Sequence, residues 1–300
     1  MKKKTYLFAL MAMVLTLGSC SDNENGIGGE TSKYITVSTS IGNMTRVATD
    51  AKGGQTFEEG DEISVYAWTG APTVAPETSE RVVNNAINKL TNGSWISTPQ
   101  MLWKNNREKH YFIGVYPTAA ISDLSAGEYT FDANKQTESD LLVAVNPDGL
   151  SYSADAQQTV PLTFTHVMAK LAVNLTYKNQ WGGIPTVEKV VVGNAAKEAT
   201  INYLTKVVTP STTAKEDFSL PEITENTKYV SVIIPQEEVT QLTIVIGGKN
   251  FVYDNGTPFK LESGKITTIN LEVGRNEIKL GDVKITDWED GSTFGGEALN

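Results

Sequence analysis

Residues able to carry out nucleophilic or acid–base catalysis are scarce in this chain. Its 300 residues include one cysteine, Cys20, and two histidines, His110 and His166. A structural zinc site needs about four Cys or His ligands, and a thiol protease needs a free cysteine beside a base. A serine nucleophile of the Gly-x-Ser-x-Gly type has no matching motif. The sequence therefore predicts no catalytic site, no cofactor and no metal, with both histidines packed in strands or lying at their rims.

Acidic residues leave one catalytic arrangement open. The chain has 35 of them, enough for a pair of carboxylates of the kind that hydrolyses glycosides. They are densest at 58–62 and 287–290. We interpret the first run as a polar turn before a strand at Ile63. The second is expected to be an acidic strand end, with a carbohydrate platform or a calcium site at Trp288 as the alternatives.

Residues 1–20 have the layout of a secretory signal. Three lysines at positions 2–4 precede an apolar stretch, 6–17, that is too short for an ordinary membrane-crossing helix. The Leu-Gly-Ser run before Cys20 resembles the lipobox of bacterial lipoproteins, in which the cysteine thiol takes a diacylglycerol and becomes the mature N-terminus. Cys20 is therefore the predicted lipidation site, and no cysteine remains for a disulfide.

The charge of the chain argues against a nucleic-acid partner. The formal net charge is −10, and loss of residues 1–19, which carry three lysines and no acid, lowers it to −13. Nucleic-acid binding needs clustered Lys and Arg, and no basic stripe occurs. Because anionic lipid headgroups repel an acidic protein face, we expect the lipid at Cys20 to attach the chain to a membrane.

Short β-branched and aromatic runs, separated by Gly, Asn and Pro turns, predict an all-β fold. Asn92-Gly93 is a strong hairpin signal, since both positions tolerate positive φ. Residues 82–90 have helical spacing, but their three asparagines favour a strand or irregular structure. A strand at 141–145 is expected to end at the turn residues 146–149.

The stretch 162–177 shows an alternating apolar pattern whose phase changes at His166. Side chains alternate between the faces of a strand, so the change indicates either a β-bulge or a strand that leaves one core and enters another. We favour the second reading and predict two β-sandwich domains in tandem. The expected divisions are a signal at 1–20, a tether and first strand at 21–46, and domains at 47–160 and 161–300.

Four segments, taken in order, resemble signatures of the fimbrillin-like proteins, the subunits of type V pili of Bacteroidales. They are 57–66 (Phe-Glu-Glu-Gly-Asp-Glu-Ile-Ser-Val-Tyr), 110–117 (His-Tyr-Phe-Ile-Gly-Val-Tyr-Pro), 140–144 (Asp-Leu-Leu-Val-Ala) and 162–171 (Leu-Thr-Phe-Thr-His-Val-Met-Ala-Lys-Leu). The resemblance implies two transthyretin-like β-sandwiches, export as a lipoprotein, and a location at the outer membrane and in the fimbrium.

The same resemblance implies that an arginine-specific protease removes the tether together with the first strand. A cut between Arg46 and Val47 would fall after the alternating strand 34–41. The exchanged residues of that strand would be Ile35, Val37, Thr39 and Ile41. Their loss leaves an apolar groove and an unpaired strand edge, which a strand from another subunit repairs. The alternative is that Arg46 is an ordinary loop residue and the lipid anchor is kept.

The donated strand is expected near the C-terminus. Val283 and Ile285 alternate with polar residues before Trp288, out of phase with the apolar residues that precede Gly281. The sequence therefore predicts that 283–288 can separate from the preceding strand. Residues 289–300 are mostly polar, which makes a long donor a poor fit and leaves the position in the pilus (tip, stalk or accessory) open.

These observations predict a non-enzymatic pilus subunit that assembles by strand exchange and supports cell adhesion. Its partners would be other pilus subunits, the outer membrane through Cys20 before trimming, and a host or microbial surface ligand. The alternative function is a monomeric, lipid-anchored, glycan-binding lipoprotein. An exported hydrolase is a weaker third reading.

Overall fold

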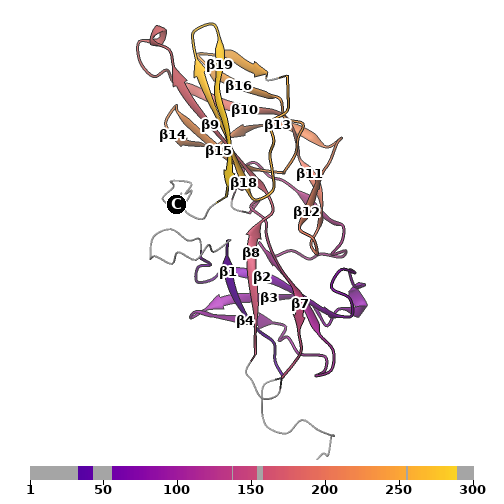
Figure 1. The fold of residues 1–300 in the computed structure, drawn as a ribbon. Helices are drawn as coiled ribbons and strands as arrows, with labels where there is room; N and C mark the ends of the chain where they lie inside the picture. The colour runs from indigo at the N-terminus through magenta and orange to yellow at the C-terminus, as the bar shows by residue number, and fades with distance from the viewer. Residues whose placement is uncertain (1–32, 43–55, 137, 154–157, 255, 289–300) are drawn as a thin grey trace, which may run out of the picture. The chain divides into compact units, whose positions relative to one another are not determined.

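The computed structural model describes residues 33–42, 56–136, 138–153, 158–254 and 256–288, all in one compact unit (Figure 1). Cys20, Arg46 and Val47 lie outside these residues. Apart from two 3-10 turns, η1 (Thr78–Glu80) and η2 (Asn179–Trp181), the elements described are strands. The all-β prediction is confirmed. Within the described part of the chain, no helix is long and apolar enough to cross a membrane.

The N-terminal half is built on one seven-stranded sheet. In sheet order its strands are β1 (Thr36–Ile41), β8 (Thr159–His166), β7 (Leu142–Leu150), β5 (His110–Tyr116), β2 (Glu62–Thr69), β3 (Val83–Thr91) and β4 (Ser94–Thr98). All neighbours pair antiparallel except β1, which runs parallel to β8. Residues 82–90, whose spacing is helical, form β3, and Asn92-Gly93 forms the predicted hairpin turn with positive φ at both residues.

Both faces of the central strands are buried. On β2, Val65 belongs to a smaller core cluster that also receives β1, whereas Tyr66 belongs to a larger cluster shared with the C-terminal half. On β5, Phe112 and Ile113 divide between the clusters in the same way. Two-sided burial explains why these strands are continuous apolar runs and not alternating ones.

The C-terminal half has three sheets. A four-stranded sheet contains β13 (Lys215–Leu220), β10 (Val187–Ala196), β16 (Gln241–Ile246) and β17 (Lys249–Asp254). A five-stranded sheet contains β14 (Glu222–Thr224), β15 (Lys228–Ile233), β9 (Ala169–Tyr177), β18 (Lys265–Val273) and β19 (Ile278–Asp287). A three-stranded sheet contains β12 (Val207–Pro210), β11 (Glu198–Asn202) and β6 (Gly127–Thr130).

The change of phase at His166 corresponds to a break between two strands. β8 ends at His166 and β9 begins at Ala169, in a different sheet. The buried residues of β8, such as Phe164, belong to the smaller core cluster, whereas Val167 and those of β9 belong to the larger one. The chain therefore passes from one core to another, and the single long strand expected over 162–177 is replaced by two.

β6 links the two halves of the sequence. It pairs antiparallel with β11, so that Gly127 lies opposite Ile201 and Thr130 opposite Glu198. Phe131, which follows β6, packs at 5.1 Å from Phe218 in the larger core cluster. Residues from before the expected boundary at 160 thus complete the C-terminal half, and the division into domains at 47–160 and 161–300 stays a prediction.

β7 extends further than its sequence indicates. The turn residues Asn146 to Gly149 were expected to end it, but the strand continues to Leu150. The pairing with β5 shifts register between His110 and Phe112, and the Asn146 side chain accepts a hydrogen bond from the Gly149 amide at 2.9 Å. The turn residues therefore form an irregularity inside a strand, because β5 offers a partner on both sides of it.

Candidate functional site

The most distinctive site in the described residues is the one that holds β1. We call it the β1 seat and define it by the edge of β8, the segment 101–103 and Trp95. β1 forms a parallel ladder with β8 in which Thr36 lies opposite Thr159 and Ile41 opposite Phe164. The Gly42 amide extends the contact by donating to the Phe164 carbonyl at 2.9 Å. Because β1 is an end strand of its sheet, this ladder is its only extended pairing.

The N-terminal end of β1 is held by a different segment. The Ile35 amide donates to the Met101 carbonyl at 3.0 Å, and the Trp103 amide donates to the Lys33 carbonyl at 3.1 Å. Tyr34 forms an isolated bridge with Leu102. The strand is thus fixed on one side by β8 and, at its start, by the segment 101–103, which the sequence reasoning did not connect with it.

The floor of the β1 seat is apolar. Ile35 and Val37 are 2% and 6% exposed and belong to the smaller core cluster, and Ile41 packs against that cluster while partly buried. Thr39, on the same side, is half-buried. Burying a side chain the size of Ile or Val is worth roughly 1.5 to 3 kcal/mol. Removing β1 would therefore open a cavity in the core and uncover the backbone edge of β8.

Gly114 makes room for the part of β8 that carries the end of β1. A Cβ atom on Gly114 would lie 2.6 Å from the ring of Phe164 and 3.1 Å from Leu162. Phe164 could not lie across β5 in its present place if position 114 carried a side chain. The glycine within 110–117 therefore has a packing role next to the β1 seat.

β1 also contacts β4, the other end strand of the same sheet. Trp95 of β4 donates through Nε1 to the Thr39 hydroxyl at 3.0 Å. The ring of Trp95 also packs edge-on against Phe57 at 5.3 Å. Trp95 and Phe57 come from segments far from β1 in sequence, and no spacing in the sequence indicates that they meet it.

Phe57 anchors the chain just after the segment that contains Arg46 and Val47. Its ring lies edge-on 5.1 Å from Phe164 and 5.3 Å from Tyr116. Gly42, on the other side of that segment, is hydrogen-bonded to the same Phe164. The two flanks of residues 43–55 are therefore attached at one point of β8, one by a single backbone bond and the other by an aromatic cluster.

The predicted donor residues belong to β19, an end strand of the five-stranded sheet. Val283 and Ile285 lie opposite Ile269 and Thr267 of β18 and are 41% and 38% exposed. The break of phase at Gly281 appears as a register shift in this pairing, within one strand. Trp288 follows the strand and is 7% exposed.

Both histidines are packed, as expected. His110 is fully buried, its Nε2 accepts the Lys104 amide at 3.1 Å, and burial lowers the pKa of its imidazole. His166 Nδ1 lies 2.9 Å from the Asp140 carboxylate. The described residues contain no group of three or more His, Cys, Asp or Glu side chains placed to hold a metal ion.

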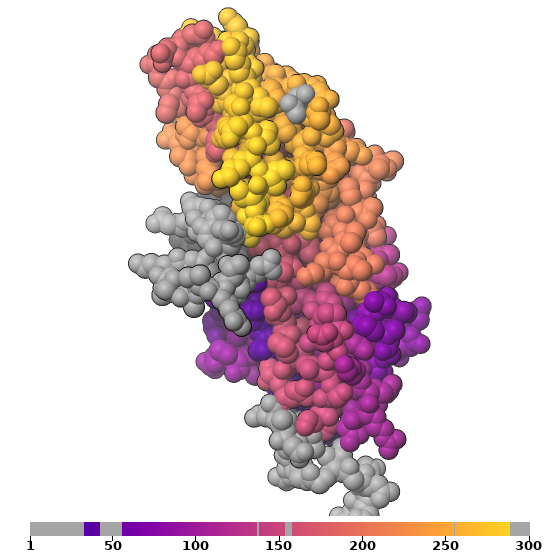
Figure 2. All heavy atoms as spheres, in the orientation of Figure 1, coloured from indigo at the N-terminus to yellow at the C-terminus, as the bar shows by residue number. Residues whose placement is uncertain are grey.

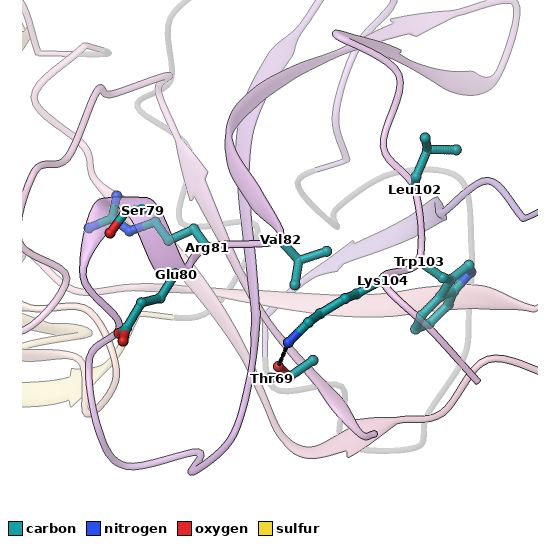
Figure 3. Close-up of a pocket in the computed structure, with 8 residues that line it drawn as sticks. All are labelled: Thr69, Ser79, Glu80, Arg81, Val82, Leu102, Trp103 and Lys104. Carbon is teal, nitrogen blue, oxygen red and sulfur yellow. Dashed lines mark hydrogen bonds between the residues drawn. The ribbon is translucent and has the colours of Figure 1, made fainter. Parts of the chain in front are cut away.

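A shallow hollow of about 650 Å³ lies beside the segment 102–104 (Figure 3). Its two basic side chains make contacts within the protein: Lys104 donates to Thr69 at 3.1 Å and pairs with Glu108 at 3.4 Å, and Arg81 points away to the Ile121 and Ser122 carbonyls. Trp103 is only 8% exposed, so its ring offers no stacking face for a sugar.

Comparisons with known proteins point to one family. A family model described as fimbrillin-like matches residues 45–288, a stretch that begins after β1 and ends at Trp288. A protein of Bacteroides uniformis named as the fimbrium subunit Fim1C is 25% identical over 325 residues, covering 100% of this chain and 99% of its own length.

Solved structures share the fold. A cell adhesion protein of Bacteroides ovatus superimposes with a TM-score of 0.62 at 18% identity, over 85% of this chain and 98% of that one. Another from Bacteroides uniformis gives 0.61 at 17% identity, over 86% and 100%. At these identities the likeness concerns the fold, and it agrees with the all-β architecture described above.

Proposed function

The chain belongs to the fimbrillin-like family, and from that premise we propose a fimbrial subunit that assembles by exchanging β1 for a strand of another subunit. Its location is the cell surface, in the fimbrium, and its partners are other fimbrial subunits. The matched relatives reported above are named for fimbrial and adhesive roles, which supports a structural and not an enzymatic function.

One observation carries the strand-exchange part of the proposal. Val37 of β1 and Ile35 just before it are buried in the core, yet β1 is tied to the following residues only through 43–55 and to the sheet mainly through β8. A cut after Arg46 would separate it covalently while Phe57 keeps the new N-terminal region on the body. The exposed edge of β8 and the vacated apolar floor are then complementary to an extended apolar strand.

The test is trimming of the mature chain at residues 43–55. Limited trypsin treatment is followed by size-exclusion chromatography of the wild type, of Arg46→Ala, and of the double variant Arg46→Ala/Lys52→Ala, because Lys52 offers a second cut in the same segment. We expect the trimmed wild type to assemble and the double variant to stay monomeric. A trimmed protein that remains monomeric, alone and with sister subunits, contradicts strand exchange for this chain.

We further propose that Cys20 carries the lipid that holds the untrimmed chain at the outer membrane. The Leu-Gly-Ser-Cys run at the end of an apolar stretch supports this. Metabolic labelling with a fatty acid should mark the wild type and not Cys20→Ala. Label retained in Cys20→Ala would remove the lipoprotein part of the proposal and leave the β1 seat unaffected.

The tandem arrangement of two transthyretin-like domains, with a boundary near residue 160, is part of the same proposal. The passage from β8 to β9 between sheets supports it. Because β6 pairs with β11, a fragment 161–300 should fold less completely than a fragment that also contains residues 127–141. Two-dimensional NMR of 161–300 and of 118–300 tests this, since well-dispersed spectra for the longer fragment alone are expected.

A further inference from the structure

β19 is held to the protein in an unusual way. It is an end strand that pairs with β18 on one side only. None of its ten residues is buried, and the C-terminal part of the described chain, in yellow, lies on the visible surface in Figure 2. Strands of small domains are usually retained by apolar side chains in the core. In β19 only the first residue, Ile278, packs against the larger core cluster, and it is only partly buried.

The weakness does not come from a polar sequence. Leu280, Val283 and Ile285 lie opposite β18 residues that are buried, and partners in an antiparallel ladder share a face. These three side chains therefore point to the core side of the sheet. They nevertheless remain 36%, 41% and 38% exposed, so the layer that covers the face under β18 does not extend over β19.

The residue after the strand is the exception. Trp288 is 7% exposed, and its ring stacks on His166 with the ring centres 4.0 Å apart and the planes 7° from parallel. The ammonium of Lys170 lies 4.1 Å from the ring centre on a cation–π contact. The Trp288 amide donates to the Gly264 carbonyl at 2.9 Å. One side chain thus makes the contacts that the rest of β19 lacks.

The site that receives Trp288 is formed by residues at the end of β8, at the start of β9 and just before β18. His166 ends β8 and is paired with Asp140, and Lys170, which is 3% exposed, lies at the start of β9. The Gly264 amide is itself bonded to the Met168 carbonyl at 2.8 Å. The site is therefore built where the chain passes between its two cores.

We propose that Trp288 is an autoinhibitory latch: its insertion between His166 and Lys170 keeps β19 on its own sheet, and its release allows β19 to leave as a unit. The inference rests on the proposed strand exchange and takes β19, which carries the predicted donor residues Val283 and Ile285, as the strand given to another subunit. With the latch closed, the backbone edge of β19 that faces β18 is occupied and the strand cannot be donated.

The latch is tested by hydrogen exchange on the mature, untrimmed chain. Trp288→Ala should speed exchange of the amides at 283–287 by roughly tenfold or more, the effect of losing a stacked and a cation–π contact. Exchange in β1 should not change. Trp288→Phe keeps an aromatic ring, so its amides at 283–287 should exchange at rates within about threefold of the wild-type rates.

Two matched variants separate a latch from general destabilisation. Trp181→Ala removes a tryptophan that is bonded to Val273 near the other end of the β18–β19 hairpin, and it should leave exchange at 283–287 unchanged. Lys170→Met removes the cation and keeps most of the chain length, and it should give an intermediate increase. Equal acceleration in β1 and β19 of Trp288→Ala, or no acceleration in β19, overturns the proposal.

Assembly then distinguishes this inference from the proposed function. After trimming, Trp288→Ala should assemble faster than the wild type. If exchange at 283–287 rises in Trp288→Ala but neither trimmed protein assembles, the latch stands and strand exchange fails. If the trimmed wild type assembles and Trp288→Ala leaves exchange at 283–287 unchanged, the strand-exchange function stands and the latch is wrong.

Discussion

The first and last strands of the described residues, β1 and β19, are both end strands of their sheets, but they are attached by opposite means. β1 is short, and Val37 within it and Ile35 just before it are part of a core. β19 is longer, and it is held by a backbone ladder and by Trp288 beyond its end. Burial along a strand makes its loss costly and its dissociation slow, whereas a ladder fixed at one end can open cooperatively from that end. From this difference we expect the loss of β1 to cost more stability than the loss of β19.

Deleting each strand gives the largest expected contrast. A chain starting at Val47 loses the burial of Ile35 and Val37, worth roughly 1.5 to 3 kcal/mol each, and leaves a cavity. A chain ending at Gly274 loses β19 and Trp288 but few other buried contacts. Urea unfolding followed by circular dichroism should show the larger loss of stability for the β1 deletion. A larger loss on deleting β19 would refute the comparison.

The same substitution at the two ends sharpens the contrast to single side chains. Ile35→Ala removes a side chain that is 2% exposed and should cost about 2 to 4 kcal/mol of unfolding free energy. Ile285→Ala removes one that is 38% exposed and should cost less than about 1 kcal/mol. Chemical denaturation of the two variants, each compared with the wild type, measures both values. Similar losses of unfolding free energy in the two variants would mean that the exposed fraction of a side chain does not predict its contribution to the attachment of these strands.

Weakening the contact between β1 and β4, the two end strands of the seven-stranded sheet, should destabilise β1 by a smaller amount. Trp95→Phe keeps a ring beside Phe57 but removes the Nε1 donor to Thr39, a hydrogen bond worth about 0.5 to 1.5 kcal/mol. Hydrogen exchange of β1 should quicken by a corresponding factor while β19 is unaffected. Thr39→Val removes the acceptor of the same hydrogen bond and is the control. The double variant should exchange the β1 amides little faster than either single variant, because both changes remove the same bond.

The smallest effect expected is a dependence of the β1 seat on pH. Burial, opposed by the nearby Glu108, lowers the pKa of His110 below its ordinary value of about 6.5. The unfolded chain then takes up a proton before the folded one does. The stabilisation is complete above the unfolded pKa and is lost as the pH falls from there through the lower folded pKa.

Protonated His110 can no longer accept the Lys104 amide, next to the segment 101–103 that holds the start of β1. The protection factor of the Ile35 amide, which is its intrinsic exchange rate at each pH divided by the observed rate, should therefore fall as the pH is lowered from about 7.5 to 5.5 across the ordinary histidine range. His110→Gln has a non-titrating acceptor, and its pH dependence should be weaker. An unchanged pH dependence in this variant would assign the effect to other groups.

Features that depend on a few neighbouring residues could be predicted from the sequence. Alternation of apolar side chains marked β1, Asn92-Gly93 marked the hairpin, and the change of phase at His166 marked the passage from β8 to β9. Each of these is a local property, because strand periodicity and turn conformation are set by a few consecutive residues. The family resemblance rested on the same local runs.

Which strands pair with one another could not be predicted from the sequence and is seen in the tertiary structure. The parallel pairing of β1 with β8 joins residues more than a hundred positions apart, and so does the stacking of Trp288 on His166. The pairing of β6 with β11 crosses the boundary that periodicity indicated. Alternation specifies which face of a strand is apolar, but the same face fits many partners. The choice among them depends on how both cores are filled at once, and no single segment carries that information.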